Sequence, residues 1–207
     1  MSTRDSPRPP AEISSRDARA HDAAIEAAAR LVLGRGPGAV SIGAVHAASG
    51  IGRDRLLRMY RSRGGVVAAV YIEGHRRVSA LCTARRYHRM TAVDTVLACA
   101  RALVEHAAAD PVVRALHALE MSTTAADTGL PSIYLVLTAW MTDTLTPRPE
   151  CSAAERTRIG EIASVVVAVV AGMSAPRAAD SIPTHAATRA RSRVLAALLS
   201  EFDDHHR

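Results

Sequence analysis

Hydrophobic positions recur along the chain at the three- and four-residue intervals of an amphipathic helix. The first clear case covers residues 16–33, which are rich in alanine, with Ile25, Ala28 and Val32 on one face. Glycine and proline at positions 34–38 then break the helix. The pattern therefore predicts one N-terminal helix that packs a single apolar face against the rest of the chain.

The stretch 41–63 predicts two short helices that reverse direction at a glycine. Ser41 is a residue type that caps helix N-termini, and Gly50 tolerates the positive φ that a reversal requires. Both helices carry an apolar stripe, formed by Ile42, Val45, Ala48, Ile51, Leu56, Leu57 and Tyr60. This layout is typical of a helix-turn-helix.

The second of these helices is strongly basic. Between positions 51 and 63, five arginines stand against one acid, Asp54. A helix-turn-helix places its second helix in the major groove, where guanidinium groups bind guanine edges or phosphates. The alternative is a basic helical hairpin on the surface of another all-α protein. We expect DNA contacts from Ser41, Arg53, Asp54, Arg55, Arg58, Arg61 and Arg63.

Within this set, the expected roles differ. Arg53, Arg55 and Arg58 are the candidates for reading bases or holding the backbone. Arg61 and Arg63 are expected to bind phosphates, which position the protein without specifying a sequence. Ser41 and the backbone N–H groups at its helix N-terminus are suited to one further phosphate.

Punctuating residues divide the rest of the chain into more helices, and no alternating strand pattern occurs. The valine-rich run 164–172 favours a strand by propensity, but between helical neighbours it indicates a helix buried on most sides, such as one in a dimer interface. The predicted class is all-α. The expected helices cover 66–87, 91–109, a segment from 110, a segment ending near 145, 152–172 and 185–202.

Composition agrees with a helical, DNA-binding protein. Of 207 residues, 48% are hydrophobic and only 3% aromatic, and the net charge of +6 favours a polyanionic partner. Cys82, Cys99 and Cys151 form neither a disulfide framework nor a zinc spacing, which fits a reducing cytoplasm. The first residues do not form a signal peptide, and the run 162–173 is too short to cross a membrane. We expect a cytoplasmic, nucleoid-associated protein without a membrane partner.

The chain offers little support for catalysis. Its nine histidines show no metal-binding spacing, and neither a nucleophile elbow nor a phosphate loop is present. We therefore expect no catalytic residue, no metal site and no cofactor, and classify the protein as a non-enzyme.

The first 65 or so residues resemble the DNA-binding domain of the TetR family of bacterial repressors. The similar positions run from the helix ending at Leu33, through Gly36 and Ser41, to the turn 48–51 and Tyr60 and Arg63. This resemblance implies a homodimer that places two recognition helices on a palindromic double-stranded operator. It divides the chain into a flexible arm at 1–15, a three-helix DNA-binding domain at 16–63, and a larger helical ligand-binding and dimerisation domain at 64–207.

The sequence departs from the family pattern at three places. Leu57 stands where the family usually has an aromatic residue that contacts the DNA backbone, and Asp54 stands where a small residue is usual. Gly64 and Gly65 replace an acidic and apolar pattern at the start of the connecting helix.

The second part is similar to the γ-butyrolactone receptors of Streptomyces. The similar segments are 110–120, 129–145 and 169–199. The resemblance implies that Trp140 lines a ligand cavity, while the alternative for Trp140 is a core residue with no ligand. Polar partners for the ligand are then expected among Tyr134, Thr138, Tyr87 and His88.

Together these observations predict a ligand-responsive repressor. A small apolar effector, such as a γ-butyrolactone or a related butenolide or furan, would release it from its operator. One alternative is a pseudo-receptor that senses an antibiotic or an intermediate. Another is a small-molecule binding protein or enzyme with a vestigial DNA-binding domain, for which Leu57 is the best support.

Overall fold

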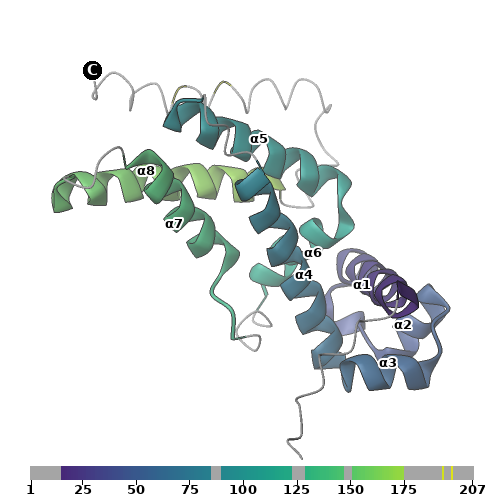
Figure 1. The fold of residues 1–207 in the computed structure, drawn as a ribbon. Helices are drawn as coiled ribbons and strands as arrows, with labels where there is room; N and C mark the ends of the chain where they lie inside the picture. The colour runs from purple at the N-terminus through teal and green to yellow at the C-terminus, as the bar shows by residue number, and fades with distance from the viewer. Residues whose placement is uncertain are drawn as a thin grey trace, which may run out of the picture.

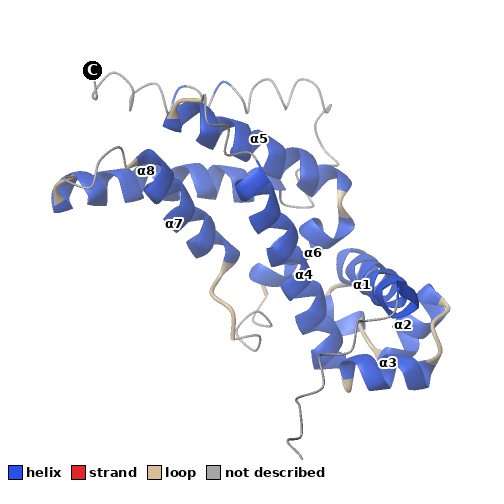
Figure 2. Cartoon of the chain, in the orientation of Figure 1, coloured by secondary structure: helices blue, strands red, loops and turns tan. Residues whose placement is uncertain are grey.

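The computed structural model describes residues 15–84, 90–122, 129–146 and 151–174, together with positions 193 and 197. Over these ranges the chain is helical with connecting loops and contains no strand (Figure 2), which confirms the predicted all-α class. The elements are α1 (Ser15–Arg35), the 3₁₀ helix η1 (Pro37–Ala39), α2 (Ile42–Ser49), α3 (Arg53–Tyr60), α4 (Arg63–Ala84), α5 (Ala92–Ala109), α6 (Pro111–Glu120), α7 (Ile133–Leu145) and α8 (Ala153–Ser174).

Capping side chains begin several helices where the sequence predicts them. The Thr91 hydroxyl accepts a hydrogen bond from the Asp94 backbone N–H at 3.0 Å. The Ser152 hydroxyl accepts one from the Glu155 N–H at 3.2 Å. The connecting helix α4 begins at Arg63, three residues before the expected start. The expected arm 1–15 lies outside the described residues apart from its last position, and so does the expected helix 185–202 apart from positions 193 and 197.

The helices form two groups joined by α4 (Figure 1). Helices α1, α2 and α3 pack together at one end of the molecule, and α5, α7 and α8 lie at the other. Helix α4 runs from α3 toward α5, and α6 packs against both α1 and α4. Buried alanine, valine and leucine side chains form one hydrophobic core that continues through both groups. Helix α6 therefore links the N-terminal group to the rest of the protein.

The valine-rich run forms part of α8 and is not a strand. Val166 and Val170 are buried within the protomer, whereas the Val165 side chain is 47% exposed. Packing within one protomer therefore buries Val166 and Val170. Val165 is the large apolar side chain of this run that stays exposed. No helix in the described part of the chain is long and apolar enough to cross a membrane.

Two glycines allow α4 to approach its neighbours closely. A Cβ atom at Gly65 would lie only 1.9 Å from the carbonyl oxygen of Tyr60, the last residue of α3. A Cβ atom at Gly74 would lie 2.7 Å from Cβ of Leu116 on α6. Gly65 is one of the positions at which the chain departs from the TetR pattern. The close approach of α3 to α4 is the physical reason for a glycine at this position.

We expect Gly65→Ala to destabilise the protein by about 1–3 kcal/mol or more, because the new methyl group would overlap backbone that cannot move freely. Gly64→Ala is the matched control, since a Cβ there meets only the Ser62 hydroxyl at 3.6 Å. Alanine at this helical position should stabilise the protein by about 0.5–1 kcal/mol. Urea unfolding followed by circular dichroism measures both changes, and equal effects would contradict the tight junction.

Candidate functional site

Helices α2 and α3 form the predicted hairpin. The chain reverses at Gly50, which has a φ of 71°, and the Ser41 hydroxyl caps α2 by accepting a hydrogen bond from the Ala44 N–H at 3.0 Å. Val45 of α2 and Leu56 of α3 are fully buried. Both helices are thus fixed through one apolar face, which leaves the opposite face of α3 available for contacts.

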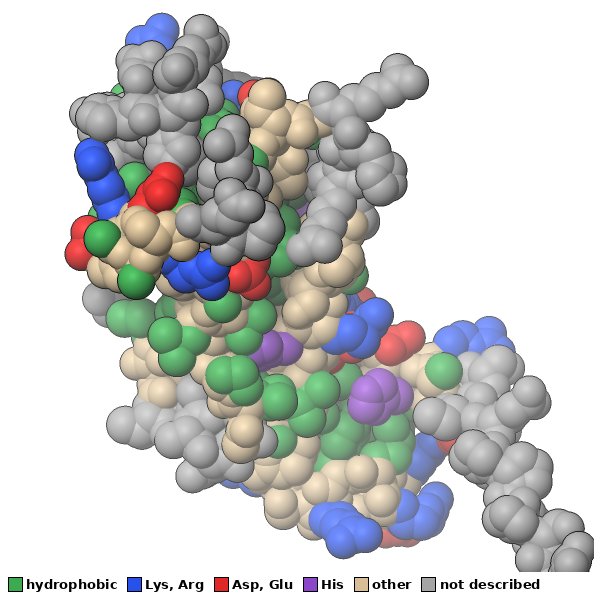
Figure 3. All heavy atoms as spheres, turned by 60° about the vertical axis from the view of Figure 1, so that its left-hand side comes forward, with side chains coloured by type: hydrophobic (Ala, Val, Ile, Leu, Met, Phe, Trp, Pro, Cys, Tyr) green, Lys and Arg blue, Asp and Glu red, His purple; other side chains and the backbone are tan. Residues whose placement is uncertain are grey.

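The exposed face of α3 carries most of the predicted DNA-binding side chains. Arg53, Asp54, Leu57 and Arg58 are exposed, as is Arg61 directly after the helix. In Figure 3, arginine side chains project from the lowest edge of the described part, at the end where α3 lies in Figure 1. This face is therefore basic with one apolar side chain, Leu57, that is 46% exposed.

Two predicted arginines instead have partners within the protein. The Arg55 guanidinium forms an ion pair with Asp17 of α1. The Arg63 guanidinium donates a hydrogen bond to the backbone carbonyl of Pro37 at 3.1 Å. This ion pair attaches α3 to α1, and the Arg55 side chain remains 28% exposed.

A second contact ties α3 to α1. The Tyr60 hydroxyl lies 3.0 Å from Nδ1 of His21 and also donates to the His21 carbonyl oxygen at 3.4 Å. Burial, with a smaller contribution from Asp22, raises the pKa of Tyr60 to about 12, so the phenol stays protonated. A groove of about 600 Å³ lies beside this contact, between α1, the end of α3 and α4.

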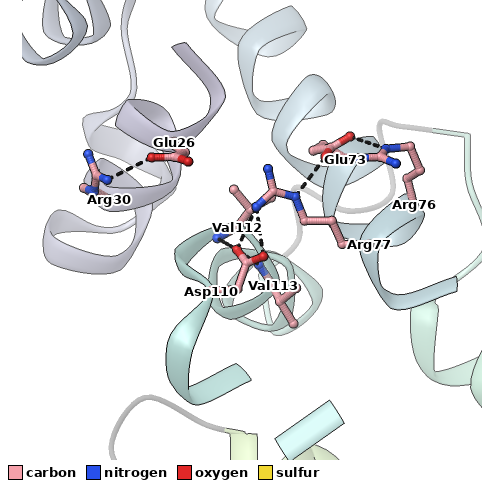
Figure 4. Close-up of polar contacts among 8 residues, drawn as sticks. All are labelled: Glu26, Arg30, Glu73, Arg76, Arg77, Asp110, Val112 and Val113. Atoms are coloured by element: carbon pink, nitrogen blue, oxygen red, sulfur yellow. Dashed lines mark hydrogen bonds and ion pairs between the residues drawn. The ribbon is translucent and has the colours of Figure 1, made fainter. Parts of the chain in front are cut away.

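An arginine on α4 binds the N-terminus of α6 (Figure 4). The Arg77 Nη1 donates to both carboxylate oxygens of Asp110, at 3.0 and 2.8 Å, while its Nε donates to Glu73 at 2.8 Å. Asp110 also caps α6 by accepting a hydrogen bond from the Val112 N–H at 2.8 Å. The hydrogen bonds of Arg76 and Arg77 lower the pKa of Glu73 to about 2, against the opposing effect of burial. Figure 4 also shows the exposed Glu26–Arg30 pair of α1 at 2.9 Å.

A buried carboxylate joins the other end of α6 to α4 and α7. The Glu120 side chain is only 4% exposed. It accepts hydrogen bonds from the Tyr71 hydroxyl at 2.6 Å, the Ile133 N–H at 2.6 Å and the Ser132 hydroxyl at 2.9 Å. All three partners donate, so the site suits the ionised form of the carboxyl group, which only accepts.

Two histidines lie beside this carboxylate. Nε2 of His75 is 3.9 Å from a Glu120 oxygen, and the His75 ring lies against Tyr71 with ring centroids 4.8 Å apart. Nδ1 of His117 is 3.2 Å from the Tyr134 hydroxyl. Burial lowers the pKa of His117 to about 4, with Glu120 opposing the shift, so this imidazole is neutral near pH 7. Burial lowers the pKa of His75 as well.

Among the residues that the structure describes, three buried side-chain nitrogens have no hydrogen-bond partner. They are Nε2 of His75, which lies 3.9 Å from a Glu120 oxygen, Nε2 of His117 and Nε1 of Trp140. Of the predicted ligand-binding residues, Tyr134, Thr138 and Trp140 all lie on α7 and are partly buried. Tyr87 and His88 lie outside the described residues. Sequence reasoning missed Tyr71, His75, His117 and Glu120, because their spacing along two amphipathic helices looks like that of ordinary core and surface positions.

The structure also brings two cysteines together. Sγ of Cys82 on α4 lies 3.4 Å from Sγ of Cys99 on α5, and both residues are buried. Their wide sequence spacing gave no sign of this contact. No group of three or more metal-ligating side chains occurs among the residues that the structure describes.

The neutral, buried state of His117 makes stability depend on pH. The unfolded state, with an ordinary histidine pKa near 6.5, binds a proton that the folded state does not bind until about pH 4. Stability should therefore be full above pH 6.5 and fall by about 3 kcal/mol between pH 6.5 and pH 4. Urea unfolding across this range should show a smaller fall for His117→Phe, while His106→Phe, at an exposed position on α5, should keep the full fall. An unchanged fall in His117→Phe would contradict this assignment.

Comparison with solved structures identifies the fold. One similar structure, described as the molecular basis for control of antibiotic production by bacterial hormones, has a TM-score of 0.69 at 20% identity and covers 87% of this chain and 96% of its own. A γ-butyrolactone receptor (ArpA-like protein) has a TM-score of 0.65 at 18% identity and covers 90% and 98%. A TetR-like transcriptional regulator from Rhodococcus sp. RHA1 has a TM-score of 0.69 at 15% identity and covers 86% and 92%. The chain thus has the fold of these regulators over most of its length.

No family description matches the sequence, and no curated protein is significantly similar to it. At identities of 20% or below, the solved structures establish the architecture of the chain and leave its activity to be argued from its own residues.

Proposed function

We propose that this protein is a TetR-family transcriptional repressor that binds a palindromic operator as a homodimer in the cytoplasm and is released by a small effector. The observation that carries the proposal is the solvent-facing side of α3, which presents Arg53 and Arg58 on a helix fixed by buried Val45 and Leu56. A helix held in this way is the element that a helix-turn-helix places in the major groove.

The contacts of α6 support the effector response. Helix α6 packs against α1, which holds α3 through Asp17 and His21. Its two ends bind α4 and α7 through Asp110 and Glu120. A molecule that binds more tightly when α6 is in one of two positions would increase the population of that position. In a dimer, this movement would change the distance between the two α3 helices. Among the similar structures, AibR in complex with isovaleryl coenzyme A and operator DNA has a TM-score of 0.59 at 15% identity.

The DNA-binding proposal predicts strong salt dependence and a specific role for Arg58. If a dimer neutralises five or six phosphates, log K should fall against log salt with a slope of roughly −5. Arg58→Ala should weaken specific binding by about 1–3 kcal/mol and affect non-specific binding less, if it reads a base. Arg101→Ala, at an exposed position on α5, is the matched control and should change neither.

Gel-shift or anisotropy titrations measure both the salt slope and the loss of affinity in Arg58→Ala. The duplexes for these titrations are selected by the protein from genomic fragments. Absence of binding to any fragment, or a slope near zero, would exclude a DNA-binding function.

The homodimer is expected to use the exposed side of α8. Val165 is 47% exposed there, and the same stripe continues with two small exposed residues, Ser164 and Ala168, and with the exposed Glu161 one turn earlier. A two-fold interface would bury this surface. Val165→Glu should yield a monomer by light scattering and lose operator binding, while Ala80→Glu, on the exposed side of α4, should remain a dimer. Val166→Glu is unsuitable as a test because Val166 is buried in its own protomer. A Val165→Glu dimer that still binds DNA would place the interface elsewhere.

A further inference from the structure

Two cysteines from different helices meet inside the protein. Sγ of Cys82, in the last turn of α4, lies 3.4 Å from Sγ of Cys99 on α5. The Cys82 residue is 5% exposed and Cys99 is 0% exposed. The two residues are 17 positions apart in the chain, so the contact depends on the packing of α4 against α5.

The distance between the two sulfurs suits bond formation. A disulfide has an S–S bond of about 2.05 Å, so the two atoms need to approach each other by about 1.3 Å more. Rotations of about 25° about the two Cα–Cβ bonds, within the usual spread of a rotamer, are enough to close a gap of this size. The contact therefore places both sulfurs within reach of a crosslink between α4 and α5.

The contact also affects the reactivity of Cys82. Its hydrogen bond with Cys99 lowers the pKa of the Cys82 thiol, against the opposing effect of burial. A lower pKa increases the share of thiolate, which is the nucleophilic form of cysteine. Cys82 is also the less buried of the two residues, so it is the sulfur that an oxidant reaches first.

Burial limits which oxidant can react. Thiol–disulfide exchange requires the attacking sulfur to contact the other disulfide directly, and glutathione disulfide is a large charged molecule. Hydrogen peroxide is small and uncharged, so it is the class of oxidant that suits two sulfurs inside a core. The alternative is that both cysteines act only as small apolar core residues.

We infer that Cys82 and Cys99 form a site of reversible oxidation, at which a small peroxide produces a disulfide between α4 and α5. The Cys82 thiolate attacks one peroxide oxygen, the O–O bond breaks, and the leaving hydroxide takes up the proton released by Cys82. The Cys99 thiol then attacks the sulfur of the resulting sulfenic acid, whose hydroxyl leaves as water with the Cys99 proton. The two sulfurs lose two electrons in total, and the peroxide is reduced to two molecules of water.

The crosslink would restrain the helix that joins the two groups of helices. Cys82 lies near the C-terminal end of α4, whereas Gly65, near its N-terminal end, packs against Tyr60 of α3. Oxidation would therefore attach to α5 the end of α4 that is remote from α3. The inference concerns the two thiols alone and does not depend on DNA binding.

The Cys151→Ser variant tests the inference directly, because the chain has three cysteines and this variant keeps only Cys82 and Cys99. The folded variant is treated with hydrogen peroxide, the peroxide is removed with catalase, and the remaining thiols are alkylated in denaturant. We expect both thiols to be lost, and to return with dithiothreitol. In a tryptic digest, residues 78–85 and 90–101 should appear as one disulfide-linked pair. Persistence of both thiols, or sulfinic acid without the linked peptides, would overturn the inference.

Single-cysteine variants in the same background test the order of the steps. With Cys99→Ala, the remaining Cys82 should be oxidised beyond the thiol, because no second thiol can form the disulfide. With Cys82→Ala, the remaining Cys99 should stay a thiol under the same treatment. Oxidation of Cys99 but not Cys82 would overturn the assignment of Cys82 as the sulfur attacked first.

Two further measurements test burial and the native contact. Glutathione disulfide should oxidise the Cys151→Ser variant only after unfolding in urea, and equal rates for the folded and unfolded protein would overturn the selection of a small peroxide. The oxidised variant should unfold at a Tm roughly 5–10 °C above the reduced one, because the bond closes a loop in the unfolded chain. An unchanged or lower Tm would contradict a bond formed across the native contact.

If Cys151→Ser does not fold, the peptide map of the wild-type protein decides the question. Cys151 lies in a separate tryptic peptide, 115–156, so the pair 78–85 and 90–101 identifies the proposed bond. Absence of that pair from peroxide-treated wild-type protein would overturn the inference.

Discussion

The attachment of α6 to α4 is the constraint on which the arrangement of the whole protein depends. At one end of α6, Asp110 caps the helix and binds Arg77 through both carboxylate oxygens. At the other end, Glu120 accepts from Tyr71 of the same connecting helix. Between these two contacts, Gly74 lets Leu116 approach the α4 backbone closely. Two charged anchors and one close apolar contact thus fix α6 along α4.

Because α6 also packs on α1, its position bears on that of α3. Helix α1 binds α3 through the Asp17–Arg55 pair and the His21–Tyr60 contact. Gly65 brings the start of α4 against the end of α3. Helix α3 is therefore attached to two elements, α1 and α4, that are themselves in contact with α6. Helices α1, α3, α4 and α6 thus form a closed set of contacts.

Tyr71, His75, His117, Glu120 and Tyr134 place polar groups inside a largely apolar core, where α4, α6 and α7 meet. Nε2 of His117 has no hydrogen-bond partner there, and Nε2 of His75 is no closer than 3.9 Å to a Glu120 oxygen, which lowers the stability of the surrounding core. Natural proteins keep such unfavourable groups mainly where function needs them, since apolar replacements would otherwise be more stable. Here the groups lie between α4 and α7.

The sequence by itself determined the local features of this protein. Helical periodicity, the caps at Ser41, Thr91 and Ser152, and the reversal at Gly50 predicted most of the described helices, as well as the helix-turn-helix. These features depend on residues within about one helical turn of each other, so a linear pattern contains them. The basic character of α3 was likewise visible as a run of arginines.

Only the tertiary structure decided which side chains meet. Arg55 and Asp17 are 38 residues apart, and Tyr71 and Glu120 are 49 residues apart. The same holds for the two cysteines and for the burial of Val166, which the packing of α8 in its own protomer determined. One sequence pattern is compatible with many ways of packing its helices. Which polar groups become paired, and which buried nitrogens remain unpaired, depends on the crossing of helices that lie far apart in the chain.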